Sequence, residues 1–210
     1  MKDIILIGGG GHCKSVIDSI SKTKEYNILG ILDLPDKVGE EILGVKIIGT
    51  DDQLEYYFKK GIRHAFLTIG SIGDITLRKK LYFVASDIGY FFPNIIDKTA
   101  IIPEKIQIGH GNFISKGAII NSDTVIGYNC IINTGAVIEH DCYIGDFCHI
   151  GPRSILSGNV KIGCNTHIGA NTTIIQNINV GENTIVGAGS VVVKDIDSNK
   201  KAYGNPCREV

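Results

Sequence analysis

The second half of the chain carries a hydrophobic repeat with a period of six residues. An aliphatic residue stands at every sixth position from Ile102 to Val192. Four places after most of them comes a small or β-branched residue, as at Ala118, Cys130 and Thr166. Alternate side chains of a strand point to the same face, so positions one and five of each hexad are expected to point inward together. The pattern predicts a solenoid of short parallel strands.

Small and polar residues at fixed positions of the repeat predict turns between these strands. A glycine or another small or polar residue usually follows the aliphatic one, as at Gly109, Gly127 and Gly145. Three hexads would make a three-sided coil of eighteen residues, and coils would stack at about 4.8 Å, the ordinary spacing of paired strands. The tight interior corner explains why position five is small. An ordinary β-sandwich would show alternation without this fixed phase, so the β-helix is favoured.

The first ninety or so residues follow a different pattern. Short apolar runs alternate with segments of helical spacing. We expect strands at 4–7, 27–32, 65–69 and 89–92 and helices at 14–21, 51–60 and 78–86. Asp51 or Asp52 is expected to cap the middle helix. This alternation is typical of a small parallel α/β domain of Rossmann-like type. A linker near Pro93 and Asn94 then divides the chain into domains 1–93 and 94–210.

Charge and composition limit the kinds of molecule that the protein is expected to bind. The 210 residues carry a formal net charge of −1, which provides no basic field for nucleic acid or an anionic membrane surface. No apolar run reaches the roughly 20 residues that span a bilayer, and the run at 4–7 is too short for a signal peptide. Six cysteines without such a signal indicate free thiols. We therefore expect a cytoplasmic protein that binds neither nucleic acid nor membrane.

A glycine-rich turn lies between the first expected strand and helix. Residues 8–11 are all glycine and His12 follows, so backbone N–H groups at a helix N-terminus could approach a phosphate. The dinucleotide fingerprint would need a third glycine at position 13, which is cysteine. Asp33 ends the second strand, where an acid commonly binds a ribose hydroxyl. Half a Rossmann unit favours a mononucleotide; a tight turn without ligand is the alternative.

A histidine beside an acid is the strongest catalytic candidate. His140 and Asp141 occupy positions three and four of their hexad, which face outward near a corner. Asp141 can hold one ring nitrogen while the other takes a proton, as a general base requires. Gly158 lies eighteen residues further on, one coil above, so its backbone N–H is expected beside the imidazole. The alternative is an ordinary surface histidine.

The hexads from about 95 to 195 resemble the hexapeptide repeats of the left-handed β-helix acyltransferases. The whole chain resembles the PglD/NeuD-like sugar O- and N-acetyltransferases. This resemblance rests on the repeats together with the Gly-rich turn and His12 at 8–12 and the segment Glu139-His140-Asp141. The left hand is implied by this resemblance alone, because parallel crossovers are generally right-handed.

The resemblance also implies roles for particular residues. In the family the N-terminal domain binds the nucleotide-linked sugar, and the matching positions are Gly9, Gly10, Gly11, His12, Asp33 and Gly70. His140 would be the base and Asp141 its orienting partner, while the Gly158 N–H would bind the thioester carbonyl. Asn133 and His149 fall on acceptor-binding positions. Cysteine stands at 13 and 207 where alanine is usual in the family.

The expected activity is acetyl transfer from acetyl-CoA to the amine of a nucleotide-linked amino-sugar, by direct attack, in bacterial surface glycan biosynthesis. By the same resemblance, acetyl-CoA lies between neighbouring subunits of a homotrimer. O-acetylation of sialic acid is the alternative within the family, and the sequence does not distinguish the two acceptors. Alternatives of other classes are a γ-carbonic-anhydrase-like metalloenzyme and a nucleotide-sugar-binding protein without catalysis.

Two histidines, the inward cysteines and a group of basic residues are the remaining candidates for function. His149 and His167 lie eighteen residues apart and would stack, but a zinc site needs a third ligand, and the H-x-x-x-x-H spacing of the metalloenzymes is missing. No metal is therefore predicted. The inward cysteines are expected to fill space. A basic cluster near the C-terminus would either contact coenzyme A phosphates or form a solvated tail; its members are Lys194, Lys200, Lys201 and Arg208.

Overall fold

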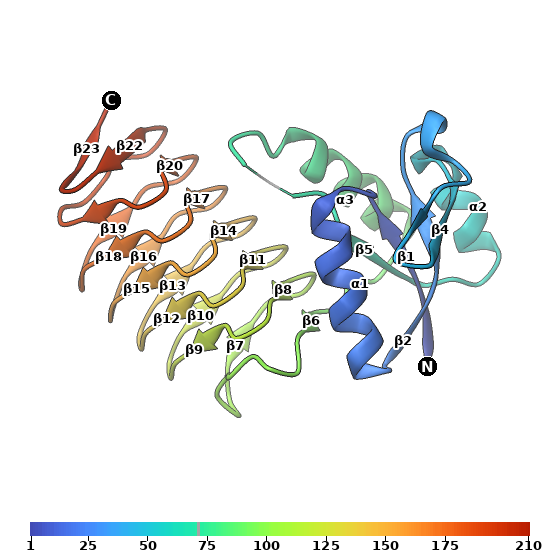
Figure 1. Cartoon of the computed structure of the whole chain (residues 1–210), viewed down its shortest axis with the longest axis horizontal. Coiled ribbons are helices and arrows are strands. Elements are labelled where there is room, and N and C mark those ends of the chain that lie inside the picture. The colour runs from blue at the N-terminus through green and yellow to red at the C-terminus, as the bar shows by residue number, and fades with distance from the viewer. Residues whose placement is uncertain (71) are drawn as a thin grey trace. The chain divides into compact units, whose positions relative to one another are not determined.

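The computed structural model describes residues 1–70 and 72–210 and divides the chain into two compact units, Met1–Ile95 and Ile96–Val210. The first unit contains the helices and a five-stranded sheet, and the second is built from stacked coils (Figure 1). No helix among the described residues is long and apolar enough to cross a membrane.

The first unit is a Rossmann-like α/β fold. Its elements are β1 (Lys2–Ile7), α1 (Gly11–Thr23), β2 (Tyr26–Leu32), η1 (Pro35–Lys37), β3 (Glu41–Ile42), β4 (Val45–Gly49), η2 (Asp51–Gln53), α2 (Leu54–Lys59), β5 (His64–Leu67) and α3 (Thr76–Ile88). The sheet order is β3-β4-β2-β1-β5, with β4, β2, β1 and β5 parallel. Because the carboxyl ends of parallel strands share one edge, the loops after these strands meet there.

Three local predictions in this unit are corrected. The segment 89–92 forms only a single bridge, between Phe91 and His64, because the chain turns away after one pair. Two-residue β3 pairs antiparallel with β4 through a turn in which Leu43 and Gly44 both have positive φ, so the sheet is not wholly parallel. The helix after β4 is capped by Thr50 and not by an aspartate, because extended Thr50 forms a capping box with Gln53.

The second unit is a three-sided parallel β-helix. The β7 sheet contains β7 (Gln107–Ile108), β10 (Val125–Ile126), β13 (Tyr143–Ile144), β16 (Lys161–Ile162) and β19 (Asn179–Val180). The β8 sheet contains β6 (Ile95–Ile96), β8 (Phe113–Ile114), β11 (Ile131–Ile132), β14 (His149–Ile150), β17 (His167–Ile168), β20 (Ile185–Val186), β22 (Lys201–Gly204) and β23 (Cys207–Glu209). The β9 sheet contains β9 (Ile119–Ile120), β12 (Val137–Ile138), β15 (Ile155–Leu156), β18 (Thr173–Ile174) and β21 (Val191–Val192).

The coils stack with the predicted register. Ile131 pairs with His149 and Val137 with Ile155, one full coil apart in sequence. Figure 1 shows the coils following one another in chain order. The aliphatic series is buried from Ile114 to Val192, and the small series lies beside it in the same core. The Rossmann-like unit and the hexapeptide β-helix predicted from the hydrophobic pattern are both confirmed.

The inward position five does more than fill space. Hydroxyl and thiol groups there donate to a backbone carbonyl fifteen residues further on: Cys130 to Gly145, Cys148 to Gly163 and Ser154 to Gly169 at 3.0, 3.0 and 2.8 Å. Each bond joins one coil to the next inside the core. The predicted role of the cysteines as fillers is therefore incomplete, because a thiol is also a weak donor.

Position four of every hexad from Gly111 to Gly189 adopts a left-handed backbone conformation. Asparagine, aspartate and glycine, which tolerate this conformation best, occupy most of these positions. Each coil therefore turns at three equivalent corners. The corner between a β9-sheet strand and a β7-sheet strand contains His140 and is called the His140 corner. The corner between a β8-sheet strand and a β9-sheet strand contains Asn133 and is called the Asn133 corner.

Candidate active site

The Gly-rich turn of the first unit opens into a hollow of about 260 Å³. The hollow lies at the carboxyl edge of the sheet and is lined by Gly8, Gly9, Gly10, Leu32, Asp33, Leu34, Lys37, Asp51, Ile69, Gly70, Leu77 and Leu81. Gly8 has a φ of +102°, and a Cβ there would lie 2.4 Å from Ile69, so only glycine fits. Four of the predicted nucleotide-binding residues thus line one hollow: Gly9, Gly10, Asp33 and Gly70.

The other two predicted residues, Gly11 and His12, form the first turn of α1. Gly10 is the N-cap, and no side chain caps the helix in the described structure. The first turn contains no acidic residue. Since the first N–H groups of a helix lack intrahelical partners, this end is suited to an anion such as a phosphate.

Asp33 is already engaged within the protein. Its Oδ2 accepts the Gly9 N–H at 2.6 Å and lies 3.3 Å from the Lys37 Nζ. Its Oδ1 accepts the Leu34 N–H at 2.8 Å. The carboxylate therefore holds the Gly-rich turn against the end of β2, a positioning role that the sequence prediction of a ribose contact did not include.

His140 and Asp141 form a pair at the His140 corner of the β-helix. The His140 Nδ1 lies 2.7 Å from the Asp141 Oδ2, with side chains 63% and 57% exposed. This hydrogen bond raises the pKa of the imidazole above its ordinary value. With Nδ1 facing the carboxylate, Nε2 is the nitrogen available to take a proton. Asp141 also occupies a left-handed position, which aspartate tolerates, so one residue meets both requirements.

Gly158 lies directly against the imidazole. A Cβ at this position would lie 2.7 Å from the His140 Cε1 and 2.8 Å from Nε2, so the absence of a side chain leaves room for the ring. The Gly158 carbonyl accepts the Asn177 N–H, whereas the Gly158 N–H donates to none of the residues that the structure describes. Both groups border a hollow of about 710 Å³ lined also by Asp141, Ser157, Asn159, Gln176 and Asn177. A base nitrogen and an unused N–H donor thus share one cavity.

Asn133 and His149 form a second polar pair, on another side of the coil. The Asn133 Oδ1 accepts the Thr134 N–H at 2.8 Å, which orients the amide so that its Nδ2 donates to the His149 Nε2 at 3.1 Å. The His149 side chain is buried and packs edge-on against His167, with ring centroids 4.8 Å apart.

The two polar pairs do not meet within this chain. Asn133 follows β11 at the Asn133 corner, and His140 follows β12 at the His140 corner, so the side of the coil formed by β12 separates them. His140, Asp141 and Gly158 come together as predicted from their spacing, while Asn133 and His149 come together elsewhere. Among the residues described, no three His, Cys, Asp or Glu side chains are grouped so that they could hold a metal ion.

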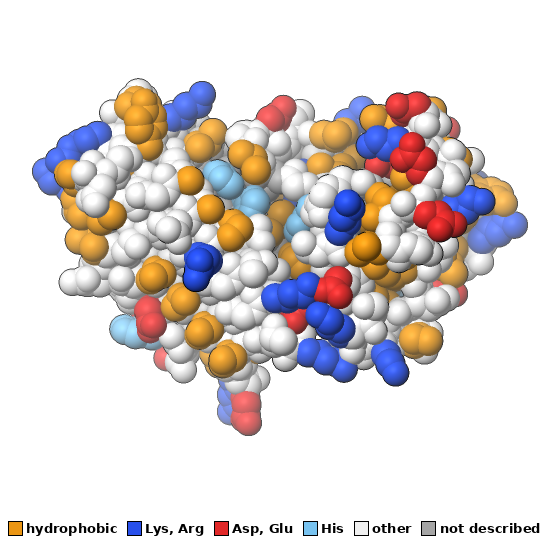
Figure 2. All heavy atoms as spheres, in the orientation of Figure 1, with side chains coloured by type: hydrophobic (Ala, Val, Ile, Leu, Met, Phe, Trp, Pro, Cys, Tyr) orange, Lys and Arg blue, Asp and Glu red, His pale blue; other side chains and the backbone are white. Residues whose placement is uncertain are grey.

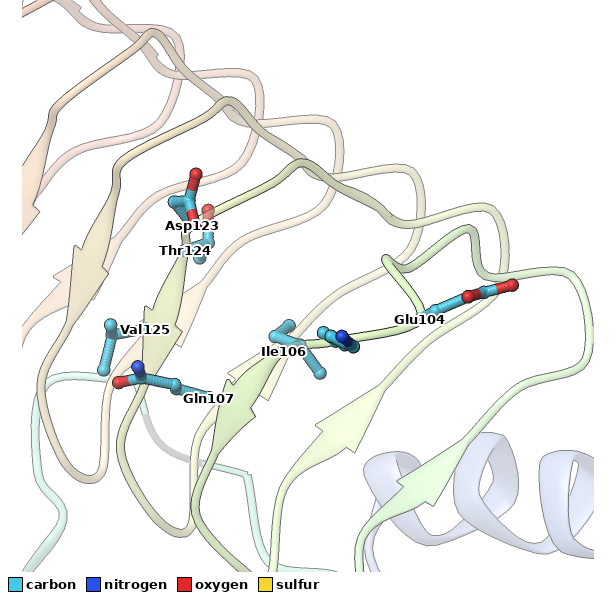
Figure 3. Close-up of a pocket in the computed structure, with 7 residues that line it drawn as sticks. Glu104, Ile106, Gln107, Asp123, Thr124 and Val125 are labelled. Carbon is cyan, nitrogen blue, oxygen red and sulfur yellow. The ribbon is translucent and has the colours of Figure 1, made fainter.

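A further hollow of about 640 Å³ lies on the same column of corners as His140, toward the N-terminal coils. Figure 3 shows Asp123 and Thr124 leading into β10, with Gln107 on the neighbouring strand β7 and Glu104 further away. Asp123 occupies the position one coil before Asp141, and the Asp141 N–H donates to the Ser122 carbonyl. Open surface therefore flanks His140 on both sides along the β-helix axis.

Comparison with known proteins identifies the family. The PglD N-terminal domain matches residues 3–84, and the bacterial transferase hexapeptide (six repeats) matches residues 123–158 and 159–194. The structure is similar to PerB from Caulobacter crescentus in complex with CoA and GDP-perosamine, at 38% identity and a TM-score of 0.93, over 100% of this chain and 98% of that chain. The chain belongs to the PglD-like family of hexapeptide-repeat sugar acetyltransferases.

Two further structures are similar over the full length of this acetyltransferase. The acetyltransferase domain of PglB from Neisseria gonorrhoeae FA1090, in complex with acetyl coenzyme A, is 29% identical with a TM-score of 0.89 and covers 100% of this chain and 99% of that chain. WeeI from Acinetobacter baumannii AYE is 23% identical over 100% of both chains, with a TM-score of 0.84, and shows the shared fold. No curated protein sequence matches. The prediction of a CoA-dependent sugar acyltransferase with a left-handed β-helix is confirmed.

Several residues of the acetyltransferase's hollows were not predicted from the sequence. Asn159, Gln176 and Asn177 also line the His140 cavity. Eighteen-residue steps would have identified them, because Asn159 lies one coil after Asp141, Gln176 one coil after Gly158 and Asn177 one coil after Asn159. Lys37 and Asp51 line the hollow of the first unit. No local motif distinguishes those two, because their position depends on which loops meet at the sheet edge.

Proposed function

We propose that this acetyltransferase transfers the acetyl group of acetyl-CoA to the amine of a nucleotide-linked amino-sugar, with His140 as the general base. The observation that carries the proposal is the common cavity of the His140 Nε2 and the unused Gly158 N–H. The solved complex of PerB with CoA and GDP-perosamine supports an amine acceptor on a nucleoside diphosphate. We expect the reaction to occur in the cytosol.

The chemistry follows from these two groups. The neutral amine attacks the thioester carbonyl while His140 Nε2 removes its proton, and Asp141 stabilises the imidazolium that forms. The carbonyl oxygen becomes an oxyanion and accepts the Gly158 N–H. Collapse of the tetrahedral intermediate breaks the carbon–sulfur bond, and the proton held by His140 passes to the departing thiolate. No covalent acyl-enzyme is required, so both substrates bind together.

We propose that the acetyltransferase is a homotrimer whose active site lies between copies. The outward positions of the β9 sheet are mostly aliphatic: Ile119, Val137, Ile155 and Val191, with Ile101 paired beside them. Ile155 is 42% exposed, although burial of apolar surface is favourable. Figure 2 shows exposed apolar side chains that recur from coil to coil. A three-fold arrangement with this sheet facing the axis would bring the His140 corner of one copy beside the Asn133 corner of the next.

The two-copy arrangement gives Asn133 and His149 a role. In one protomer they lie away from His140, whereas across a copy-to-copy contact their polar groups could bind the acceptor sugar while His140 removes its proton. The Gly-rich turn of the first unit, with Gly9, Gly10, Gly11, His12 and Gly70, would hold the diphosphate. Acetyl-CoA would occupy the cavity beside Gly158.

The test is a thiol-release assay with acetyl-CoA and a panel of acceptors. The panel contains GDP-perosamine, UDP-4-amino-4,6-dideoxy-sugars, sialic acid and its CMP derivative. Turnover on a nucleotide amino-sugar, reduced about 10²- to 10⁴-fold in a folded His140→Ala variant, is the expected result. Turnover on sialic acids only would overturn the amine acceptor. Near-normal turnover in His140→Ala would remove His140 from the mechanism.

A further inference from the structure

We propose that Asp51 selects the nucleobase, by accepting the ring N–H donor of a base that carries one, such as guanine or uracil. The inference rests on the proposed function of the first unit as the nucleotide-binding unit. Asp51 follows β4 and lines the hollow beside the Gly-rich turn.

The position of Asp51 on the sheet edge separates it from the phosphate site. The order β4-β2-β1 places the end of β4 two strands away from the Gly-rich turn, which follows β1. Two strand spacings are about 9–10 Å. A diphosphate at the N-terminus of α1 would therefore leave the ribose near the end of β2 and the base near the end of β4. A carboxylate at that distance would not repel the phosphates at close range.

The hollow has the chemistry of a nucleobase pocket. Its walls include Leu34, Ile69, Leu77 and Leu81, which can pack against the faces of a planar ring. Its volume of about 260 Å³ is below the roughly 300–1,000 Å³ that encloses a drug-sized ligand, so it fits part of a nucleotide-sugar. Carboxylates are acceptors only, and they therefore favour a ring edge that presents N–H donors.

Asp51 is the carboxylate of this hollow with unused acceptor capacity. Asp33 uses both oxygens on the Gly-rich turn, Leu34 and Lys37. The Asp51 Oδ1 is closed off from solvent and meets no hydrogen-bond donor within the described residues. Burial, together with the charge of Asp33, raises the pKa of Asp51. N–H donors of a bound base would offset this cost, and rotation about the soft Cβ–Cγ bond could bring either oxygen to them.

The experiment measures binding of GDP, UDP, CDP and 2′-deoxy-GDP by titration calorimetry to the full-length protein. The variants are Asp51→Asn and, as a matched control, Asp52→Asn, which removes the same charge from the exposed neighbouring residue. We expect wild type to prefer GDP or UDP over CDP, because the N3 position of cytosine is an acceptor. Asp51→Asn should weaken the preferred nucleotide about 5- to 150-fold and leave CDP equal or improved, because an amide can donate. Asp52→Asn should change none of them.

Two results would overturn the inference. If Asp51→Asn weakens the binding of all four nucleotides equally, Asp51 has a structural role. If Asp51→Asn removes the difference in affinity between GDP and 2′-deoxy-GDP, Asp51 contacts the ribose and not the base. If the Asp51→Asn variant does not fold, Asp51→Glu, which keeps the charge, is measured as the second variant. If the wild type transfers acetyl to a nucleotide-sugar and the Asp51→Asn variant keeps the base preference of the wild type, only this inference is overturned. A wild type that binds no nucleoside diphosphate and acetylates no nucleotide sugar overturns the proposed function as well.

Discussion

Three residues of one corner set the chemistry at the residue scale. His140 lies against Gly158 and beside Asp141, so its Nδ1 is engaged and its Nε2 faces the cavity. Gly158 contributes through what it lacks: it has no side chain, and its N–H meets no acceptor among the residues that the structure describes. Each contact can be altered separately.

Replacing Asp141 by asparagine should move the pH profile. The carboxylate raises the pKa of His140, and a general base works only when it is unprotonated. Without that charge the pKa falls, so the acidic limb of kcat/KM should move to lower pH while the maximal rate decreases. Asparagine tolerates the left-handed conformation of position 141, so the corner is kept. A pH–rate profile of Asp141→Asn measures this, and an unmoved limb would mean that the carboxylate does not act on the base.

Gly158→Ala should lower kcat by displacing the imidazole. The new Cβ would lie under 3 Å from the ring, and the exposed His140 side chain would turn away without disturbing the core. Gln176→Ala, one coil further along the same column, is the matched control and should cost much less. In the double variant His140→Ala with Gly158→Ala, no additional loss is expected if the glycine acts only by accommodating the ring. A full additional loss would instead mean that the alanine side chain obstructs the cavity independently of His140, because alanine keeps the backbone N–H of position 158.

At the scale of the element, the hexad repeats one environment many times. Every coil presents the same left-handed corner at position four, and position five places a small or β-branched side chain in the core, which in several hexads also donates to the next coil. Strand pairing supplies the backbone bonds, and the corners determine how easily the chain can turn. Most corners use asparagine, aspartate or glycine, but Phe147 and Arg153 occupy two of them.

Arg153→Asn should stabilise the β-helix by about 0.5–1 kcal/mol. An arginine in the left-handed region has its Cβ close to the following carbonyl oxygen, a strain of about 1–2 kcal/mol that asparagine largely avoids. Arg153 is exposed, so little packing is lost. Asn171→Ala, one coil further on, should destabilise by a similar amount. Denaturant unfolding monitored by circular dichroism compares the two, and an unchanged or lower stability of Arg153→Asn would contradict the assignment of strain.

The repeat explains which features could be predicted from the sequence. Periodicity identified the β-helix, its inward residues and the stacking of Gly158 on His140, because eighteen residues always return to the same column. The first unit offers no such period. The β3–β4 hairpin depends on a two-residue strand, and the segment 89–92 has the composition of a strand but lacks a partner beyond Phe91. The engagement of Asp33 and the position of Asp51 depend on loops brought together by the sheet.

At the scale of the whole molecule, the separation of the two polar pairs is the main constraint on mechanism. The His140 corner and the Asn133 corner lie at opposite ends of the same side of the coil. In the proposed trimer, a substrate held by both corners would contact two copies. This separation is the reason for proposing an active site shared between copies.

Mixed assemblies of two inactive variants should recover activity. His140→Ala retains the Asn133 corner, and Asn133→Ala retains the His140 corner. In a mixed trimer, a His140→Ala copy can lie beside an Asn133→Ala copy so that the contact between them contains one intact Asn133 corner and one intact His140 corner. No contact in either pure trimer contains both intact corners. Co-expression with two affinity tags and sequential purification isolates the mixed species for the thiol-release assay. Activity no higher than that of the pure variants would place the whole site in one protomer.

The hairpin of β22 and β23 has a consequence for growth of the coil stack. A repeating coil presents at its last turn the same row of N–H and C=O groups as at every earlier one, which is a template for adding another chain. β23 runs antiparallel on β22, and Cys207 packs onto the core there. A further parallel coil would meet a short strand of the wrong direction on the β8 sheet. The hairpin thus covers the last parallel strand of the β8 sheet and blocks in-register addition of another parallel strand on that side of the coil.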